Sequence, residues 1–389
     1  MSRILAISEL AWPEGGGAEL ATYEILKILS KRHEVIQVTS TPSPQPIPGV
    51  RIITTPHLKP ATRPIYLLRV AKMVKENWFQ KLLKKVDTVY ITGYALPVAR
   101  EAKKYSKRVI LHTHNYTIAK YSGVNYAYEK GANTLNDIKY AIHHELRHHH
   151  STTRALGVLP LYPLFKFTTR LLDYVDTIIC VSRKQAHIIS QYLPNQRKKI
   201  AVIYNPIPED LANMDADFVE KKNWAIYVGG KSYIKGWYIF LKIALETAKK
   251  KLPILYKVTN IKTRLPLGNA EFLGRLSHND VLKLFQQSIA LLFPSMWEEP
   301  LPYVIIEAGI LRTIPIAFEV GGVKEILENT KAERFLVKQL DVNTMLTKII
   351  EVINLDKNEF IDITTDIRDK LIKKFNSEKN IEAIYKVFL

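Results

Sequence analysis

The segment from Phe293 to Glu325, FPSMWEEPLPYVIIEAGILRTIPIAFEVGGVKE, constrains the possible fold more than any other part of the chain. An apolar run of strand length, 289–293, leads into it, and prolines end that run in a loop. We expect a helix to start at Pro302, because the first helical residue needs no N–H donor. A second strand, 314–318, leads through two glycines into another helix. This order predicts a parallel βαβ unit, whose ligands bind at the carboxyl ends of the strands.

Two glutamates and a glycine pair fall at this expected ligand edge. Glu299 lies on the loop, Glu307 lies inside the helix, and Gly321 and Gly322 follow the second strand. A sugar offers neighbouring hydroxyl groups, and one carboxylate can accept hydrogen bonds from two of them. In the alternative interpretation, Glu307 is a surface charge and Glu299 is favoured only by the helix dipole.

The combined pattern resembles the donor site of the retaining GT-B glycosyltransferases with a Glu-x7-Glu signature (glycosyl transferases group 1, glycosyltransferase family 4). Its parts are Pro294-Ser295, Glu299, Glu307-Ala308 and Gly321-Gly322-x-x-Glu325. The resemblance implies that Glu307 holds the nucleotide ribose and that Glu299 contacts the transferred sugar. It also implies donor-binding roles for Gly321, Gly322 and Glu325. The resemblance covers nearly the full chain and is weakest over residues 115–160.

The resemblance implies an α/β fold in which two Rossmann-like domains face each other across a cleft. We expect an acceptor-side domain over residues 1–203, with a C-terminal helix, 373–389, returning to it. Residues 204–372 are then the nucleotide-sugar-binding domain. A length of 389 residues fits two domains, and a composition of 47% hydrophobic and 24% charged residues is typical of a folded protein.

Targeting and redox signals point to the cytoplasm. The chain begins directly with a strand-like run, 4–7, and we find neither a secretory signal nor a run of about 18 apolar residues. Cys180 is the only cysteine, so it has no internal disulfide partner. We therefore expect a cytoplasmic protein, with peripheral attachment to the cytoplasmic membrane face as the alternative to a freely soluble one.

Positive charge is concentrated in the first half of the chain. Residues 1–200 hold 30 Lys and Arg against 13 Asp and Glu, a net charge of +17, whereas residues 201–389 carry +2. The asymmetry predicts a polyanionic partner: nucleic acid, an anionic membrane or a phosphorylated acceptor. Solubility alone is the alternative. Within this half, residues 65–86 combine Trp78 and Phe79 with several Lys and Arg, which fits either a membrane-seated helix or a helix covering a sheet.

Two features of the first half match the family's donor site. Gly16 and Gly17, in the glycine-rich turn before Glu19, would let backbone N–H groups approach a phosphate or sugar. The turn is not a dinucleotide fingerprint, and a tight turn without a ligand is the alternative. The resemblance also implies that a histidine after the strand 109–111 reaches the donor sugar and its phosphate. His114 matches that position better than His112.

The second half carries the cations that the family uses to clamp the donor diphosphate. Lys235-Gly236 matches the family pattern, but Gly230 stands where an arginine is usual. Lys231 is expected to supply the missing charge, although a lysine cannot repeat the bidentate fork of an arginine. Arg275 is expected to stack on the nucleobase. Prolines at positions 300 and 302 also replace the glycines of the commoner form.

No metal or cofactor is predicted beyond the nucleotide-sugar donor. His112 and His114 could share a metal, but we find no further ligands at matching spacing. Asp215-Ala-Asp217 has the form of an Asp-x-Asp site but lies in a polar connector. The histidine-rich stretch 143–150 is compatible with metal binding, pH sensing, phosphate binding or a plain surface segment near the acceptor entrance.

The resemblance therefore implies a retaining hexosyltransferase in which His114 and Glu299 position the sugar. The lysines and the Gly16-Gly17 amides stabilise the leaving diphosphate. We find no nucleophilic carboxylate on the opposite face, so we predict no covalent intermediate. The expected acceptor is anionic and lipid-linked. An alternative acceptor is a small sugar or glycan. Alternative functions are a basic nucleic-acid-binding protein and a sugar-nucleotide-binding module without catalysis. In the main prediction, nucleic acid is not a partner.

Overall fold

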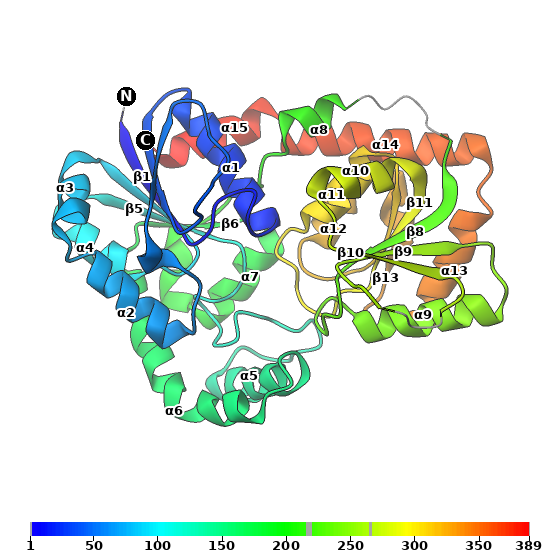
Figure 1. Ribbon diagram of the computed structural model, residues 1–389, viewed down its shortest axis with the longest axis horizontal. Helices are drawn as coiled ribbons and strands as arrows, with labels where there is room; N and C mark the ends of the chain where they lie inside the picture. The colour runs from blue at the N-terminus through cyan, green and yellow to red at the C-terminus, as the bar shows by residue number, and fades with distance from the viewer. Residues whose placement is uncertain (1, 215–219, 264–266, 389) are drawn as a thin grey trace.

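The protein is described here by a computed structural model that covers residues 2–214, 220–263 and 267–388. The Asp215-Ala-Asp217 motif lies outside the described residues. The chain forms two α/β halves that face each other, with the N-terminal half on the left of Figure 1 and the C-terminal half on the right. Each half is built on one parallel sheet covered by helices, so the predicted two-lobed α/β architecture is confirmed.

The N-terminal sheet has the strand order β3-β2-β1-β4-β5-β6-β7, and all its neighbouring strands are parallel. Its central strands are buried on both faces, which is why they are nearly continuous apolar runs. The strands are β1 (Arg3–Ser8), β2 (Glu34–Thr39), β3 (Val50–Thr54), β4 (Thr88–Thr92), β5 (Arg108–Thr113), β6 (Thr177–Cys180) and β7 (Ile200–Val202).

Seven α-helices connect these strands within the described residues. They are α1 (Gly17–Ser30), α2 (Arg63–Met73), α3 (Asn77–Lys85), α4 (Pro97–Lys103), α5 (Thr134–Arg147), α6 (Thr152–Thr169) and α7 (Arg183–Tyr192). Ser182 caps α7 by accepting a hydrogen bond from the Gln185 N–H, as its sequence position predicts. Short 3₁₀ helices lie at Pro56–Leu58, Arg170–Tyr174 and Pro194–Lys199.

The C-terminal sheet has the strand order β10-β9-β8-β11-β12-β13 and is also parallel. Its strands are β8 (Lys222–Val228), β9 (Leu255–Thr259), β10 (Ala270–Gly274), β11 (Ser288–Phe293), β12 (Ile314–Phe318) and β13 (Leu336–Val337). Its helices are α8 (Glu209–Asn213), α9 (Trp237–Lys249), α10 (His278–Gln287), α11 (Tyr303–Ile310), α12 (Val323–Leu327), α13 (Val342–Ile353) and α14 (Lys357–Phe375), with a 3₁₀ turn at Lys331–Phe335.

The chain crosses between the halves twice. Ile203 packs in the core of the N-terminal half, and Ile207 packs in the core of the C-terminal half. The last helix, α15 (Glu378–Phe388), lies against the N-terminal half beside α1 (Figure 1), where Tyr385 Oη donates to the Ile28 carbonyl over 2.8 Å. The expected boundary at residue 373 falls inside α14, so the return begins after that helix.

The basic segment 65–86 forms two helices, α2 and α3, that cover the N-terminal sheet. Phe79 and Leu83 are fully buried, and Trp78 is partly buried, with its Nε1–H donating to Glu76. The interpretation that Trp78 and Phe79 seat this segment on a membrane is therefore wrong, because Phe79 is a core residue. None of the helices within the described residues is both long and apolar enough to cross a membrane.

Candidate active site

The loop after β11 carries Glu299 and rests on the glycine pair that follows β12. The Gly322 N–H donates to the Glu299 carbonyl over 2.8 Å, and the Gly321 N–H donates to the Glu298 carboxylate. A Cβ on Gly321 would lie 1.9 Å from the Glu299 carbonyl oxygen, and Gly321 has φ +52°. Only glycine fits there. The pair therefore supports the loop from behind.

Three donors hold one oxygen of the Glu299 carboxylate. Oε1 accepts hydrogen bonds from Lys235 Nζ at 2.5 Å, Trp297 Nε1 at 2.6 Å and Ser295 Oγ at 3.0 Å. Lys235 can approach because the next residue, Gly236, has φ +78° and packs against the Pro294 carbonyl, which a Cβ would meet at 1.9 Å. Glu299, the predicted sugar contact, and Lys235, the predicted phosphate contact, are therefore next to each other.

Glu307 lies on α11 and pairs with a histidine that is not among the predicted site residues. His278 Nε2, at the start of α10, lies 2.7 Å from Glu307 Oε1. Burial lowers the pKa of His278, but the hydrogen bond and negative charge of Glu307 outweigh it and raise that pKa above its ordinary value. The helix begins at Tyr303 with Pro302 as its N-cap, so the expected start is wrong by one residue.

The glycine turn of the N-terminal half faces α11 across the cleft. The Gly16 N–H donates to the Glu19 carboxylate over 2.7 Å, which caps the start of α1. A Cβ on Gly17 would lie 3.1 Å from Cδ2 of Tyr303, whereas one on Gly16 would meet open space. Gly17 therefore permits the close approach of the two halves, and Gly16 leaves room for a ligand.

His114 directly follows β5, at the carboxyl edge of the N-terminal sheet. Its Nε2 is buried and has no hydrogen-bond partner within the described residues. Burial lowers the pKa of His114 to about 4, so the ring is neutral at pH 7. His112 is fully buried and pairs with Tyr90 Oη over 2.7 Å. Nε2 of His112 also has no hydrogen-bond partner within the described residues, but of the two histidines only His114 lines a described cavity.

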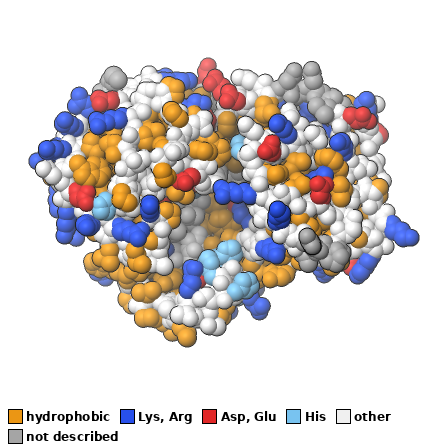
Figure 2. Space-filling view, in the orientation of Figure 1, with side chains coloured by type: hydrophobic (Ala, Val, Ile, Leu, Met, Phe, Trp, Pro, Cys, Tyr) orange, Lys and Arg blue, Asp and Glu red, His pale blue; other side chains and the backbone are white. Residues whose placement is uncertain are grey.

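These residues line one cavity of about 750 Å³ between the two halves, visible as the central hollow in Figure 2. Seven of the predicted site residues line it: Gly16, Gly17, His114, Lys235, Arg275, Glu299 and Glu307. Four others are absent from the lining of this cavity: Lys231, Gly321, Gly322 and Glu325. Lys231 is exposed, so the structure does not place it as a second cation in the cavity.

Glu325 joins the two halves instead of facing the cavity. From α12 its carboxylate accepts hydrogen bonds from the backbone N–H groups of Arg183, at 2.9 Å, and Lys184, at 2.7 Å. Tyr204 Oη donates to it at 3.0 Å. A carboxylate at these two N–H groups also matches the positive end of the α7 dipole. Glu325 therefore makes an interdomain contact in this structure, and its donor-binding role stays a prediction.

A smaller cavity of about 170 Å³ lies on the other side of His114, within the N-terminal half. Glu9 and Glu19 line it together with polar backbone and side-chain groups of the neighbouring loops. Burial raises the pKa of Glu9 to about 7. Two carboxyl groups in this position suit the hydroxyl groups of a sugar better than they suit a phosphate.

Several residues of the site are not among those predicted from the sequence. Trp12, Asn205, His278 and Trp297 line the large cavity, and Glu9 lines the small one. Position at the carboxyl end of β1 is a signal that could have revealed Glu9. His278 follows the helix-capping Ser277 and carries no comparable signal. Its role depends on the distance between α10 and α11, which local sequence does not encode.

The segment over which the family resemblance is weakest makes part of the contact between the halves. Tyr126 forms an antiparallel bridge with Trp297, and the Glu298 N–H donates to the Asn125 carbonyl over 2.8 Å. Tyr116 Oη donates to the Glu298 carbonyl at 2.8 Å. The loop that carries Glu299 is therefore held by the N-terminal half as well as by its own sheet.

Two family models match the chain. The Glycosyltransferase Family 4 model covers residues 15–211, half of the chain, and the Glycosyl transferases group 1 model covers residues 256–370. The chain belongs to Glycosyltransferase Family 4. The family membership expected from the Phe293–Glu325 segment is thus confirmed, and the two matches fall on the two halves seen in Figure 1.

Similar proteins agree with this membership. An uncharacterised glycosyltransferase of Methanocaldococcus jannaschii is 28% identical over 274 residues, which is 68% of this chain and 73% of the relative. The fold is similar to HepE of Anabaena, solved with UDP and glucose, with a TM-score of 0.68, 16% identity and coverage of 100% and 99% of the two chains. It is also similar to sucrose-phosphate synthase of Thermosynechococcus elongatus, with a TM-score of 0.69, 17% identity and coverage of 100% and 98%. This family-4 protein therefore has the GT-B fold.

Proposed function

We propose that this glycosyltransferase transfers a hexosyl group from a UDP-sugar to an acceptor hydroxyl with retention of anomeric configuration. The observation that carries the proposal is the convergence of Glu299, Glu307, Lys235 and His114 on one cavity between two parallel sheets. The choice of UDP as the first nucleotide is supported by its presence in the similar structure of HepE.

The C-terminal half holds the nucleotide in this proposal. Glu307 accepts hydrogen bonds from the ribose hydroxyls, and its partner His278 fixes the carboxylate in place. Arg275 lies at the same cavity and is available to stack on the base. Lys235 approaches the diphosphate together with backbone N–H groups at the start of α1 other than that of Gly16, which donates to Glu19. These groups stabilise the negative charge that develops as the diphosphate leaves.

Glu299 and His114 position the sugar. Three donors occupy Oε1 of Glu299, and Oε2 remains to accept hydrogen bonds from sugar hydroxyls. His114 is neutral, so it can donate from one nitrogen and accept at the other without repelling the positive charge that develops at the anomeric carbon. The acceptor hydroxyl enters from the smaller cavity, where Glu9, with its pKa of about 7, can accept a proton.

The acceptor is proposed to be anionic and lipid-linked, with the protein attached to the cytoplasmic membrane face. The net charge of +17 on residues 1–200 supports an anionic partner. Because two carboxyl groups line the smaller cavity, the acceptor's hydroxyl-bearing end belongs there and its anionic part lies farther out. The surface that supports attachment is the exposed apolar face of α6, which includes Leu156, Leu159 and Phe167.

The reaction is tested by measuring UDP release and sugar transfer with UDP-glucose, UDP-galactose, UDP-N-acetylglucosamine and, as a different nucleotide, GDP-mannose. His114→Ala and Glu299→Ala should each lower turnover at least about a hundredfold, on the scale of a lost electrostatic contact in the transition state. UDP affinity should change little in both. The exposed residues His187 and Glu319 provide matched alanine controls.

A separate measurement can contradict each part of the proposal: the roles of the two residues, the retention of configuration and the independence from metal ions. Wild-type turnover in both variants would contradict the roles of His114 and Glu299, and a product of inverted configuration by NMR would contradict retention. We also propose that transfer needs no metal ion, because Lys235 and backbone N–H groups supply the positive charge at the diphosphate. Loss of transfer after treatment with a chelator, restored by a divalent cation, would contradict this part.

A further inference from the structure

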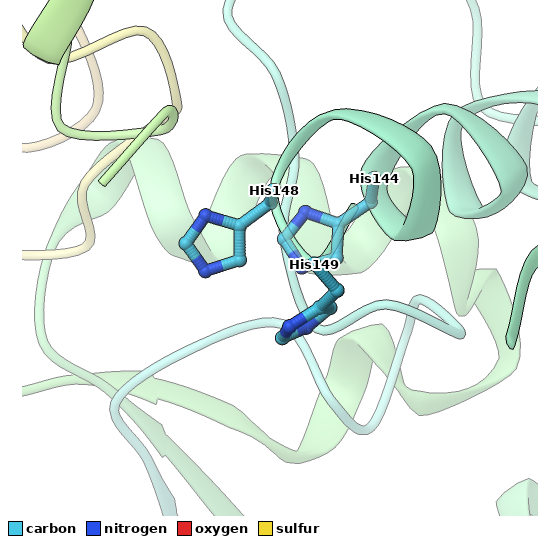
Figure 3. A group of neighbouring side chains, drawn as sticks. All are labelled: His144, His148 and His149. Carbon is cyan, nitrogen blue, oxygen red and sulfur yellow. The ribbon is translucent and has the colours of Figure 1, made fainter. Parts of the chain in front are cut away.

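Three histidines come together where α5 ends. His144 lies on the last turns of the helix, His148 is its C-cap residue and His149 follows. Figure 3 shows the three side chains next to one another where the helix ends. One ring nitrogen from each lies within 4.8 Å of the corresponding atoms of the other two, and the ring centroids are 4.8 to 5.1 Å apart.

The three rings have the properties that a metal ligand needs. Burial and the neighbouring histidines lower the pKa of His144 to about 3, and burial also lowers the pKa of His148 and of His149. All three are therefore neutral near pH 7, with a free lone pair. The Nδ1 atom of His148 is buried and has no hydrogen-bond partner within the described residues.

A partner for the buried histidine is also present. His144 Nδ1 lies 3.1 Å from Tyr126 Oη. When Nδ1–H donates to this hydroxyl, the lone pair of Nε2 is left for a ligand. Metal-ligating histidines commonly donate their second N–H to such a group, which fixes the ring orientation. The nearby Arg154 is paired with Glu145 over 2.7 Å, which offsets its repulsion of a cation.

We propose that His144, His148 and His149 bind a divalent transition-metal ion such as Zn²⁺. Imidazole is a preferred ligand for Zn²⁺, and three histidines with water in the fourth position form a known tetrahedral arrangement. Zn–N bonds of about 2.0–2.1 Å imply nitrogens about 3.4 Å apart, so the rings must close slightly. His149 is exposed and lies beyond the helix, which leaves it free to rotate.

The grouping of three histidine ligand atoms within 4.8 Å of one another favours a metal ion over the other candidates for this stretch. None of the three lines either described cavity of the active site, so the ion would not take part in transfer. It would instead tie the end of α5 to the turn that leads into α6, which begins at Thr152.

Metal binding is tested on tag-free full-length protein with Zn²⁺ in competition with a chromogenic chelator, and with Co²⁺ by its visible absorption. We expect one tight Zn²⁺ per chain, a tetrahedral Co²⁺ spectrum and a higher melting temperature with Zn²⁺. His149→Ala, an exposed change that should leave folding intact, should weaken binding at least tenfold. His150 is exposed and lies outside the cluster, so His150→Ala should change affinity less than twofold.

Three outcomes would overturn the site. The first is that the wild type binds no Zn²⁺ tightly. The second is that His150→Ala weakens Zn²⁺ binding as much as His149→Ala does, which would indicate nonspecific binding by the histidine-rich stretch. His144→Ala could also disturb folding, because His144 is buried. His148→Ala therefore serves as the second variant, with an expected loss of at least tenfold. Unchanged affinity in both His148→Ala and His149→Ala would also overturn the proposal.

Discussion

His278 and Glu307 are hydrogen-bonded between α10 and α11, with 2.7 Å between Nε2 and Oε1, at the cavity where the nucleotide is proposed to bind. The pair fixes the orientation of a carboxylate that would otherwise be free to rotate. The charge of the site also depends on pH through the protonation of His278, because the pKa of this histidine is raised above its ordinary value. In the proposed complex, the nucleotide ribose would meet a carboxylate that is already held in place.

Glu307→Gln should reduce stability more at pH 6 than at pH 8.5. The folded pKa of His278 lies above the unfolded value of about 6.5, so the contribution of the pair is complete below pH 6.5 and is lost as pH rises through the folded pKa. We expect a decrease of about 1–2 kcal/mol in the free energy of unfolding at pH 6. Urea unfolding at several pH values measures it. If the difference in unfolding free energy between the wild type and Glu307→Gln grew as the pH rose, the prediction would be contradicted.

Lys235 and Lys231 should differ in their effect on nucleotide binding. Lys235 lines the cavity, whereas Lys231 is exposed outside it. Lys235→Ala should cost about 1–3 kcal/mol of UDP affinity, the scale of a charged hydrogen bond, and Lys231→Ala less than about 0.5 kcal/mol. Calorimetric titration with UDP compares the two. Equal losses would mean that Lys231 reaches the diphosphate when the nucleotide binds.

Glu325→Ala should destabilise the protein without weakening UDP binding. The carboxylate accepts hydrogen bonds from two N–H groups of α7 and from Tyr204, so its removal leaves these donors unpaired between the halves. The expected loss is about 1–3 kcal/mol in the free energy of unfolding. Thermal or urea unfolding and UDP titration provide the two measurements. Weaker UDP binding at unchanged stability would restore the donor-binding role that the sequence pattern implied.

The sequence predicted the βαβ unit around Glu299 well, because each element there has a strong local signal. Expected strands at 289–293 and 314–318 correspond to β11 and β12, and the glycine pair precedes α12 as expected. Gly321 is informative because its positive φ and its contact with the Glu299 carbonyl admit no side chain. A backbone constraint of this kind can be predicted from the sequence, because only glycine satisfies it.

The sequence predicted less well where a side chain's partner comes from a distant element. Glu325 follows the family motif, yet its carboxylate turns to α7 of the other half. Phe79 lies in a basic amphipathic segment, and only packing against the sheet shows that it is a core residue. The Glu307–His278 pair likewise depends on how two helices approach each other. Local pattern gives the position of such residues along an element but not the contact they make.

The apolar face of α6 offers a more suitable membrane surface than α3. Leu156, Leu159 and Phe167 are 75%, 57% and 60% exposed and lie along one side of the helix, and Arg63 of α2 stacks on the ring of Phe165 on its buried side. Hydrophobic side chains gather at the lower end of the molecule in Figure 2, where Figure 1 places α6. No acidic residue occurs between Glu145 and Asp173, so the surface is apolar and basic.

Vesicle co-sedimentation tests this surface. The wild type should bind anionic vesicles better than neutral ones at low salt, because each nearby Lys or Arg contributes about 1 kcal/mol at most and is screened by salt. Replacing Leu156, Leu159 and Phe167 together by serine should lower the partition coefficient at least about tenfold, since each large apolar side chain contributes about 1.5–3 kcal/mol when fully buried. A matched triple-serine control uses exposed residues of the C-terminal half: Tyr238, Leu245 and Leu340. Equal binding to neutral and anionic vesicles, or equal losses in the two triple variants, would contradict attachment through α6.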